Sequence, residues 1–132
     1  MNMKIKILLC MLGMLFTTLA ISAQNSIDKA VDEYSSVGKS TFTSAVERDP
    51  KTRKVLKVVK VLQPTDMTIN KLRKAFLQEK ENGQFSITVN DEEETMTLTV
   101  ENEKENRVYM IKYANRRALF TNGKVTIIIK YK

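Results

Sequence analysis

The sequence predicts an α+β domain in which a mostly antiparallel β-sheet carries two helices on one face. Three observations lead to this class. Two segments repeat apolar residues at the spacing of an amphipathic helix, and after residue 83 the apolar residues recur mainly at every second position. The connections between the expected strands are short, which favours antiparallel pairing. Because each helix has one apolar stripe, both helices are expected on the same side of the sheet.

Residues 1–23 have the organisation of a secretory signal peptide. A basic start with Lys4 and Lys6 precedes an apolar run, and the small residue Ala23 marks the expected cleavage site. The apolar run is shorter than the ~20 residues that cross a bilayer as a helix, so no membrane span is expected after cleavage. We therefore expect one domain over residues 24–132, in the periplasm or secreted.

The predicted mature chain lacks the residues of the commonest catalytic and metal centres. Cys10 is the only cysteine and lies in the leader, and the whole chain has no histidine. Disulfides, Ser-His and Cys-His catalytic pairs and the usual zinc ligands are therefore excluded. We expect neither a cofactor nor a metal, and we expect a protein that is not an enzyme.

The first half of the domain is expected to contain one helix and two strands. The helix begins at Ser26 as its cap, and Gly38 is expected in the left-handed conformation just past its end. A strand follows over 41–47, and a turn at Asp49-Pro50-Lys51-Thr52 leads into a segment over 54–62. Lysines at helical spacing permit a helix in this last segment, but its β-branched residues favour a strand.

The second half is expected to contain one helix and four or five strands. Asp66 or Thr68 caps the helix, which runs to about Lys80. Strands follow over 85–89, 95–100 and 107–113, and the third should be central because both of its faces are apolar. Asn122-Gly123 predicts a hairpin turn between strands 118–121 and 125–131. The expected order is α-β-β-α-β-β-β-β-β.

Charge is sorted by segment, and this sorting supplies the candidate binding residues. Net charge is −2 over residues 24–47, +7 over 48–80, −7 over 81–106 and +7 over 107–132. Such a surface can steer a charged partner, an unidentified protein or an anionic envelope polymer, whereas an exported location argues against nucleic acid. The candidate partner-binding residues are Lys54, Lys57, Lys60, Arg116 and Arg117 on the basic side, with Glu92, Glu93 and Glu94 opposite.

Three other interpretations stay open at this stage. The carboxylates of Asp91–Glu94 could hold calcium or supply an acid/base pair to a hydrolase. The basic and acidic segments could instead dock on each other between copies of a structural envelope protein, and the oligomeric state is open. A face rich in threonine (Ser86, Thr88, Thr95, Thr97 and Thr99) could contact sugar or a partner strand, although threonine is also typical of the wet side of an antiparallel sheet.

The start of the chain reads M-N-M-K-I-K-I-L-L-C-M-L-G-M-L-F-T-T-L-A-I-S-A-Q, followed by N-S-I-D-K-A-V-D-E-Y. This start resembles small exported proteins of Bacteroidetes that are described only as domains of unknown function. The resemblance covers about the first third of the chain and implies a Gram-negative periplasmic or exported setting. It implies no catalytic residue, because none is defined for such families.

Overall fold

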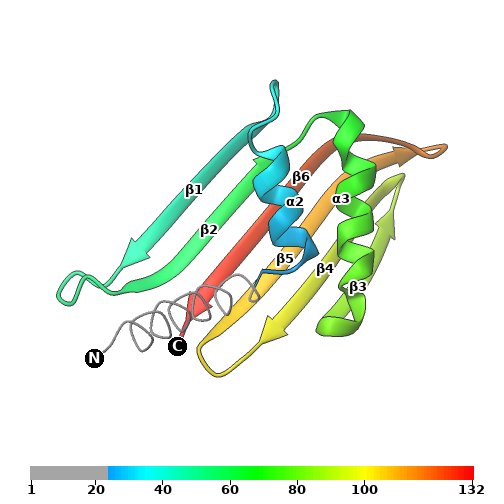
Figure 1. Ribbon diagram of the computed structural model, residues 1–132. Helices are drawn as coiled ribbons and strands as arrows, with labels where there is room; N and C mark the ends of the chain where they lie inside the picture. Colours follow the sequence, from blue (N-terminus) through cyan, green and yellow to red (C-terminus); the bar gives the residue numbers. More distant parts are fainter. Residues whose placement is uncertain (1–23) are drawn as a thin grey trace, which may run out of the picture.

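The computed structural model describes residues 24–132, so the predicted signal peptide lies outside the described residues. One antiparallel sheet of six strands, in the order β1-β2-β6-β5-β4-β3, carries both helices on one face (Figure 1). The predicted fold class is confirmed. Within the described part, no helix is long and apolar enough to cross a membrane. The elements are α2 (Ser26–Tyr34), β1 (Thr41–Arg48), β2 (Val55–Gln63), α3 (Asp66–Gln78), the 3-10 turn η1 (Lys80–Asn82), β3 (Gln84–Asn90), β4 (Glu93–Glu101), β5 (Glu105–Arg116) and β6 (Leu119–Tyr131).

Helix α2 begins one residue earlier than its sequence pattern predicts. Asn25, not Ser26, is the cap: its side chain accepts the N–H of Asp28, whose carboxylate accepts the N–H of Asn25 in return. This reciprocal capping box satisfies two backbone donors that the first turn leaves free. The helix ends at Tyr34, and the left-handed residue beyond it is Lys39 (φ 71°) rather than Gly38.

Thr65, not Asp66 or Thr68, occupies the N-cap position of helix α3, and its side chain makes no capping hydrogen bond. Thr68 lies inside the first turn, where its hydroxyl donates back to the Thr65 carbonyl at 2.9 Å. The helix ends at Gln78, close to the predicted end, and its apolar stripe is completely buried at Ile69, Leu72 and Phe76.

The hydrophobic core lies between the two helices and the sheet. Burial of the apolar side chains in this core is the main contribution to the stability of the fold, since no disulfide links parts of the domain. Both β5 and β6 contribute every second residue to it, as a strand with one covered face requires. The buried residues are Ile27 and Val31 of α2; Ile69, Leu72, Ala75 and Phe76 of α3; and Leu62, Met96, Leu98, Tyr109, Ile111, Tyr113, Val125, Ile127 and Ile129 of the sheet.

The last hairpin turns at a different place from the one that Asn122-Gly123 predicts. Residues 118–121 and 125–131 belong mostly to one strand, β6, and the two-residue turn is Arg117-Ala118, with φ of 55° and 65°. Asn122-Gly123 instead interrupts the pairing of β5 with β6 as a bulge, since Lys112 pairs with Lys124 but Ala114 pairs with Thr121. Four strands therefore follow α3, the smaller of the two predicted numbers.

Gly123 is required by packing rather than by a turn. A Cβ at this position would lie 2.8 Å from Cγ1 of Ile69 and 3.3 Å from Cγ of Pro64. The start of α3 therefore lies against bare backbone in β6. The N–H of Asn122 donates to the Asp66 carboxylate at 3.2 Å, which further links the bulge to the helix.

Candidate partner-binding surfaces

The three lysines predicted in the second strand do not form one patch. Lys54 precedes β2, whereas Lys57 and Lys60 lie on opposite faces of the sheet because side chains alternate along a strand. Lys60 shares the helix-covered face with the buried Leu62, and Lys57 lies on the face without helices, directly opposite Lys130 of β6. Lysines three residues apart would share one face of a helix, but on a strand they lie on opposite faces of the sheet.

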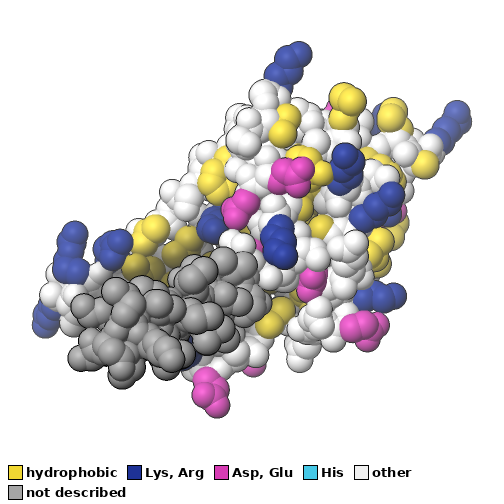
Figure 2. Space-filling model, viewed as in Figure 1, with side chains coloured by type: hydrophobic (Ala, Val, Ile, Leu, Met, Phe, Trp, Pro, Cys, Tyr) yellow, Lys and Arg dark blue, Asp and Glu magenta, His cyan; other side chains and the backbone are white. Residues whose placement is uncertain are grey.

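The basic residues that do gather lie around the turn between β1 and β2. We call this set the basic turn; it contains Arg48, Lys51, Arg53 and Lys54, all of them exposed. Figure 2 shows Lys and Arg side chains gathered at this end of the sheet, at the lower left of the view. In the described part of the chain, none of the four forms an ion pair within 4 Å.

The backbone of the basic turn is held by one aspartate. Asp49 accepts the N–H groups of Thr52 and Lys51 at 2.9 and 2.8 Å, and these bonds lower the pKa of its carboxyl group. Its N–H donates to the Lys54 carbonyl at 2.8 Å, which closes the loop. The carboxylate is thus engaged by backbone N–H groups, as is typical of an Asp-Pro turn, and among residues 24–132 it forms no ion pair with a neighbouring cation. Arg48 instead donates to the Arg53 carbonyl at 3.1 Å.

The acidic candidates lie beside their own cations rather than opposite the basic ones. Glu92 pairs with Arg116 (Oε2–Nε 2.9 Å), and Glu93 pairs with Lys112 (Oε1–Nζ 3.3 Å). The expectation that Arg116 lies on a basic side away from the acids is therefore wrong, because β4 pairs with β5 and brings both segments to the same end. Arg117 lies exposed in the turn after β5.

Glu94 belongs to a side-chain network that anchors β4 and β5 to α3. The Tyr113 hydroxyl donates to Glu94 at 2.6 Å and accepts from Nε of Arg73 at 2.7 Å, and Asn115 also donates to Glu94. The bonds from Tyr113 and Asn115 lower the pKa of Glu94, while burial is the main cause that raises the pKa of Tyr113 to about 12. The Arg73 guanidinium also lies 4.2 Å from the Phe120 ring centroid.

A second network, which the sequence analysis missed, buries a charge pair under α2. Arg107 contacts Asp28 at 3.2 Å, and the Tyr109 hydroxyl donates to the same carboxylate oxygen at 3.0 Å. Burial raises the pKa of Tyr109 to about 12. The available signal was that Arg107 directly precedes the apolar run Val108–Ile111, since a largely buried cation needs a buried partner. Asp28 is both that partner and a member of the capping box.

Beside this network lies a hollow of about 350 Å³ lined mainly by polar side chains. Burial acts to raise the pKa of Glu79, but the hydrogen bonds from the Ser26 N–H at 2.9 Å and from Asn82 outweigh it. The pKa of Glu79 is therefore lowered overall. These bonds tie η1 to the start of α2. The hollow is lined by Gln24, Asn25, Glu79, Asn82, Val100, Asn102, Glu105, Arg107 and Tyr109.

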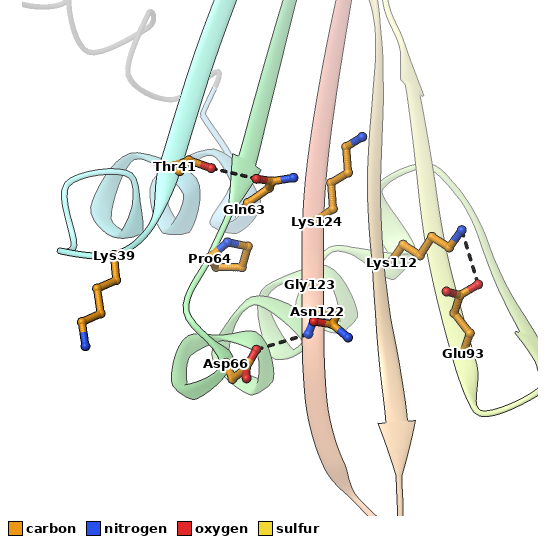
Figure 3. A pocket seen from close by; sticks show the side chains of 10 residues that line it. All are labelled: Lys39, Thr41, Gln63, Pro64, Asp66, Glu93, Lys112, Asn122, Gly123 and Lys124. Atoms are coloured by element: carbon orange, nitrogen blue, oxygen red, sulfur yellow. Dashed lines mark hydrogen bonds and ion pairs between the residues drawn. The ribbon is translucent and has the colours of Figure 1, made fainter.

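A larger hollow of about 480 Å³ opens at the other end of the sheet (Figure 3). Its polar side chains largely bond to one another: Thr41 donates to Gln63 at 2.9 Å, and Lys112 pairs with Glu93. Figure 3 shows the side chains of Lys39 and Lys124 pointing away from each other. No cationic cluster therefore converges inside this hollow.

The carboxylates of Asp91–Glu94 do not come together in a cleft. Asp91 and Glu92 form the two-residue turn between β3 and β4, with φ of 45° and 66°, and both are exposed. Over residues 24–132, no group of three or more Asp and Glu side chains is arranged to hold a metal ion.

Comparison with known proteins places the chain in a family. Residues 24–122 match the family described as Domain of unknown function (DUF5024), from α2 into β6. The chain is thus a small α+β domain of an uncharacterised class, and it belongs to the DUF5024 family. No curated protein and no solved structure matches it significantly.

Proposed function

We propose that this chain is an exported, non-enzymatic binding module that engages an anionic partner, a protein or an envelope polymer, through the basic turn. Location in the periplasm or outside the cell is part of this proposal. It is supported by the order of basic, apolar and small residues in 1–23. The family match also begins at Gln24, the residue after the expected cleavage site.

One observation carries the proposal: the glutamates at the β3–β4 turn are paired with other side chains of the described domain, whereas the cations of the basic turn are not. Glu92, Glu93 and Glu94 contact Arg116, Lys112 and the Tyr113 network, respectively. The four cations of the basic turn have no such partner within the described chain. Uncompensated cations on a protruding turn create a positive potential that attracts anionic surfaces and speeds association.

Capture from a cell-envelope extract at low and high salt tests the proposal. Residues 24–132 serve as bait, beside a variant with Lys51→Glu, Arg53→Glu and Lys54→Glu. We expect the bait to retain discrete material at low salt and to lose most of it at high salt, because screening weakens exposed charges. The variant should retain nothing above background.

The matched control reverses three exposed lysines on the helix side, at positions 71, 74 and 80. It has the same net charge as the first variant, but its basic turn is intact. Retention by this control together with loss by the first variant assigns binding to the turn. Equal loss by both variants would mean that only total charge matters and would overturn the proposal.

Self-association is a second candidate function, and the outer edge of β3 favours it. This strand carries no charged residue, and its Ile87 and Val89 side chains are 48% and 67% exposed. Natural edge strands usually carry charge or proline to prevent pairing with another chain. Sedimentation of residues 24–132 tests this alternative: a dimer abolished by Val89→Lys favours self-association, and a monomer at every concentration excludes it.

A further inference from the structure

The face of the sheet that no described helix covers carries an apolar band between two pairs of lysines. The first pair is Lys57 with Lys130, and the second is Lys112 with Lys124; both join directly opposed residues of neighbouring strands. We call them the lysine pairs. The apolar band between them consists of Ala45, Val59, Val61, Val108, Met110 and Ile128.

The strand register places the members of this band side by side. In one row, Val59 of β2 lies opposite Ile128 of β6, which lies opposite Val108 of β5. In the next row, Thr126 separates Val61 from Met110. Side chains in such rows point to one face, and here that face is the one opposite the core because their chain neighbours are buried. The band is therefore continuous across three strands.

Such a surface is unusual for the solvent side of an antiparallel sheet. The half of the same face formed by β3 and β4 has the expected composition, with Ser86, Thr88, Thr95, Thr97 and Thr99. The half formed by β2, β6 and β5 has valine, isoleucine and methionine instead. Contiguous exposed apolar patches on a small domain typically mark interaction sites.

The lysine pairs add an electrostatic signal to the apolar one. Like charges directly opposite each other on adjacent strands destabilise a sheet. Glu93 offsets this at Lys112, and Glu47 of β1 lies directly opposite Lys57 on the same face of the sheet. Lys57, Lys124 and Lys130 nevertheless form no ion pair within 4 Å among residues 24–132. A negatively charged ligand over this end of the face would relieve the repulsion that remains between Lys57 and Lys130.

We propose that this face docks an amphipathic helix of a partner protein whose apolar stripe is flanked on both sides by carboxylates. The proposal deepens the proposed function, since it rests on the chain being a binding module, and it adds a second surface and a partner chemistry. The apolar stripe covers the apolar band, and the flanking carboxylates meet the two lysine pairs. Docking of an apolar helix face on a complementary surface is a common mode of peptide recognition.

The dimensions of the surface match those of a helix. Along β6, Lys124 and Lys130 are six residues apart, which corresponds to about 20 Å on a strand. A helix with its side chains is about 10–12 Å across, so it fits between the lysine pairs and leaves about 4–5 Å on each side, which a lysine side chain is long enough to cover.

A second copy of this chain is a poorer occupant of the same face. A two-fold sandwich of two such faces would bring lysine pairs of one copy against those of the other. The resulting like-charge contacts oppose association, whereas an acidic helix replaces them with attraction. Charge complementarity therefore favours a different, acidic chain.

The probe for this proposal is a synthetic peptide of three LAALEAE heptads, blocked at both ends and labelled with a fluorophore. Its leucines form one stripe flanked by glutamates, and these glutamates oppose pairing of the peptide with itself. Anisotropy measures its affinity for residues 24–132, and amide shifts in ¹⁵N NMR spectra locate the contact. We expect saturable binding with the largest shifts in β2, β5 and β6.

Two variants with equal net charge separate this surface from general attraction. Lys57→Glu with Lys130→Glu should weaken binding about tenfold or more, since two ion pairs become repulsions. Lys60→Glu with Lys74→Glu, on the helix side, should leave the affinity nearly unchanged. A third variant, Val59→Thr with Ile128→Thr, keeps the lysines and should also weaken binding, because it makes the band polar.

Three results would overturn the proposal: no saturable binding, equal weakening by both charge variants, or amide shifts confined to the basic turn. The envelope-capture experiment separates this failure from failure of the proposed function. Capture that depends on the basic turn, with no peptide binding to the sheet face, leaves the proposed function standing and removes this inference alone. Peptide binding without such capture would leave docking on the sheet face standing and would remove the basic turn as the binding site.

Discussion

The two outer hairpins of the sheet, β1–β2 and β3–β4, occupy equivalent places at its edges but are built differently. Leu62 is the only residue of β1 and β2 that is buried, and the basic turn extends beyond the helices (Figure 1). The other hairpin buries Met96 and Leu98 and is linked through Glu94 to Tyr113. The β3–β4 hairpin is thus anchored in the core through β4, whereas the β1–β2 hairpin is mostly surface.

This difference teaches where charge supports the fold and where it is available to a partner. Acidic side chains near β4 contact cations and hydroxyl groups of the same domain, so changing them should alter stability. Cations near the β1–β2 turn contact no carboxylate within 4 Å among the described residues, so changing them should alter binding and leave the fold intact. The following predictions test this division, from the largest expected effect to the smallest.

Leu98→Ala in β4 should lower the free energy of unfolding by about 2–5 kcal/mol, because it leaves a cavity in a fully buried site. The matched change in the other hairpin is Val46→Ala in β1, where the side chain is 50% exposed. It should cost about 0.5 kcal/mol or less. Chemical denaturation of both variants measures the difference, and equal costs would contradict the comparison.

Glu94→Gln should lower the free energy of unfolding by about 1 kcal/mol at neutral pH, because it weakens the bonds from Tyr113 and Asn115. The pKa of Glu94 is lowered on folding, so its contribution is complete above the unfolded value near 4.5 and is lost as pH falls through the folded value.

The stability difference between wild type and Glu94→Gln should therefore disappear in acid, which denaturation curves at several pH values will show. A useful control is Glu81→Gln, an exposed residue for which the structure shows no hydrogen bond from a side chain among residues 24–132. A difference for Glu94→Gln that is constant with pH would mean that the carboxylate charge is irrelevant to the network.

Removal of the Glu92–Arg116 pair should have the smallest effect. Both side chains are more than 60% exposed, so Glu92→Ala should cost about 0.5 kcal/mol or less and lose its effect at high salt. A double-mutant cycle with Arg116→Ala measures the coupling. A coupling much above 1 kcal/mol would show that even the exposed part of the acidic turn stabilises the fold.

The elements were predictable because their signals are local. Alternation of apolar and polar residues locates strands, and an apolar stripe locates a helix, whatever lies opposite them. The hairpin turn was misplaced for a non-local reason: Gly123 is there to admit Ile69 of α3, and no pattern around residue 123 contains that information.

The candidate site was predictable only in its residue types. Net charge per segment located the basic stretch around residue 54 in the sequence, but the alternation of a strand places Lys57 and Lys60 on opposite faces. The neighbours of Glu92–Glu94 depend on the pairing of β4 with β5, which places Arg116 and Lys112 beside them. The pair of Lys57 with Lys130 likewise requires the sheet order, because the two residues are far apart in the sequence.

The place of β6 in the sheet has a consequence for how the chain folds. The last strand of the sequence lies in the middle, between β2 and β5, so the two halves of the sheet are joined only through it. A chain synthesised from its N-terminus therefore cannot close the six-stranded sheet before residues 119–131 have emerged. The hairpins β1–β2 and β3–β4 can pair early, but they become one sheet only when β6 has paired on both of its sides.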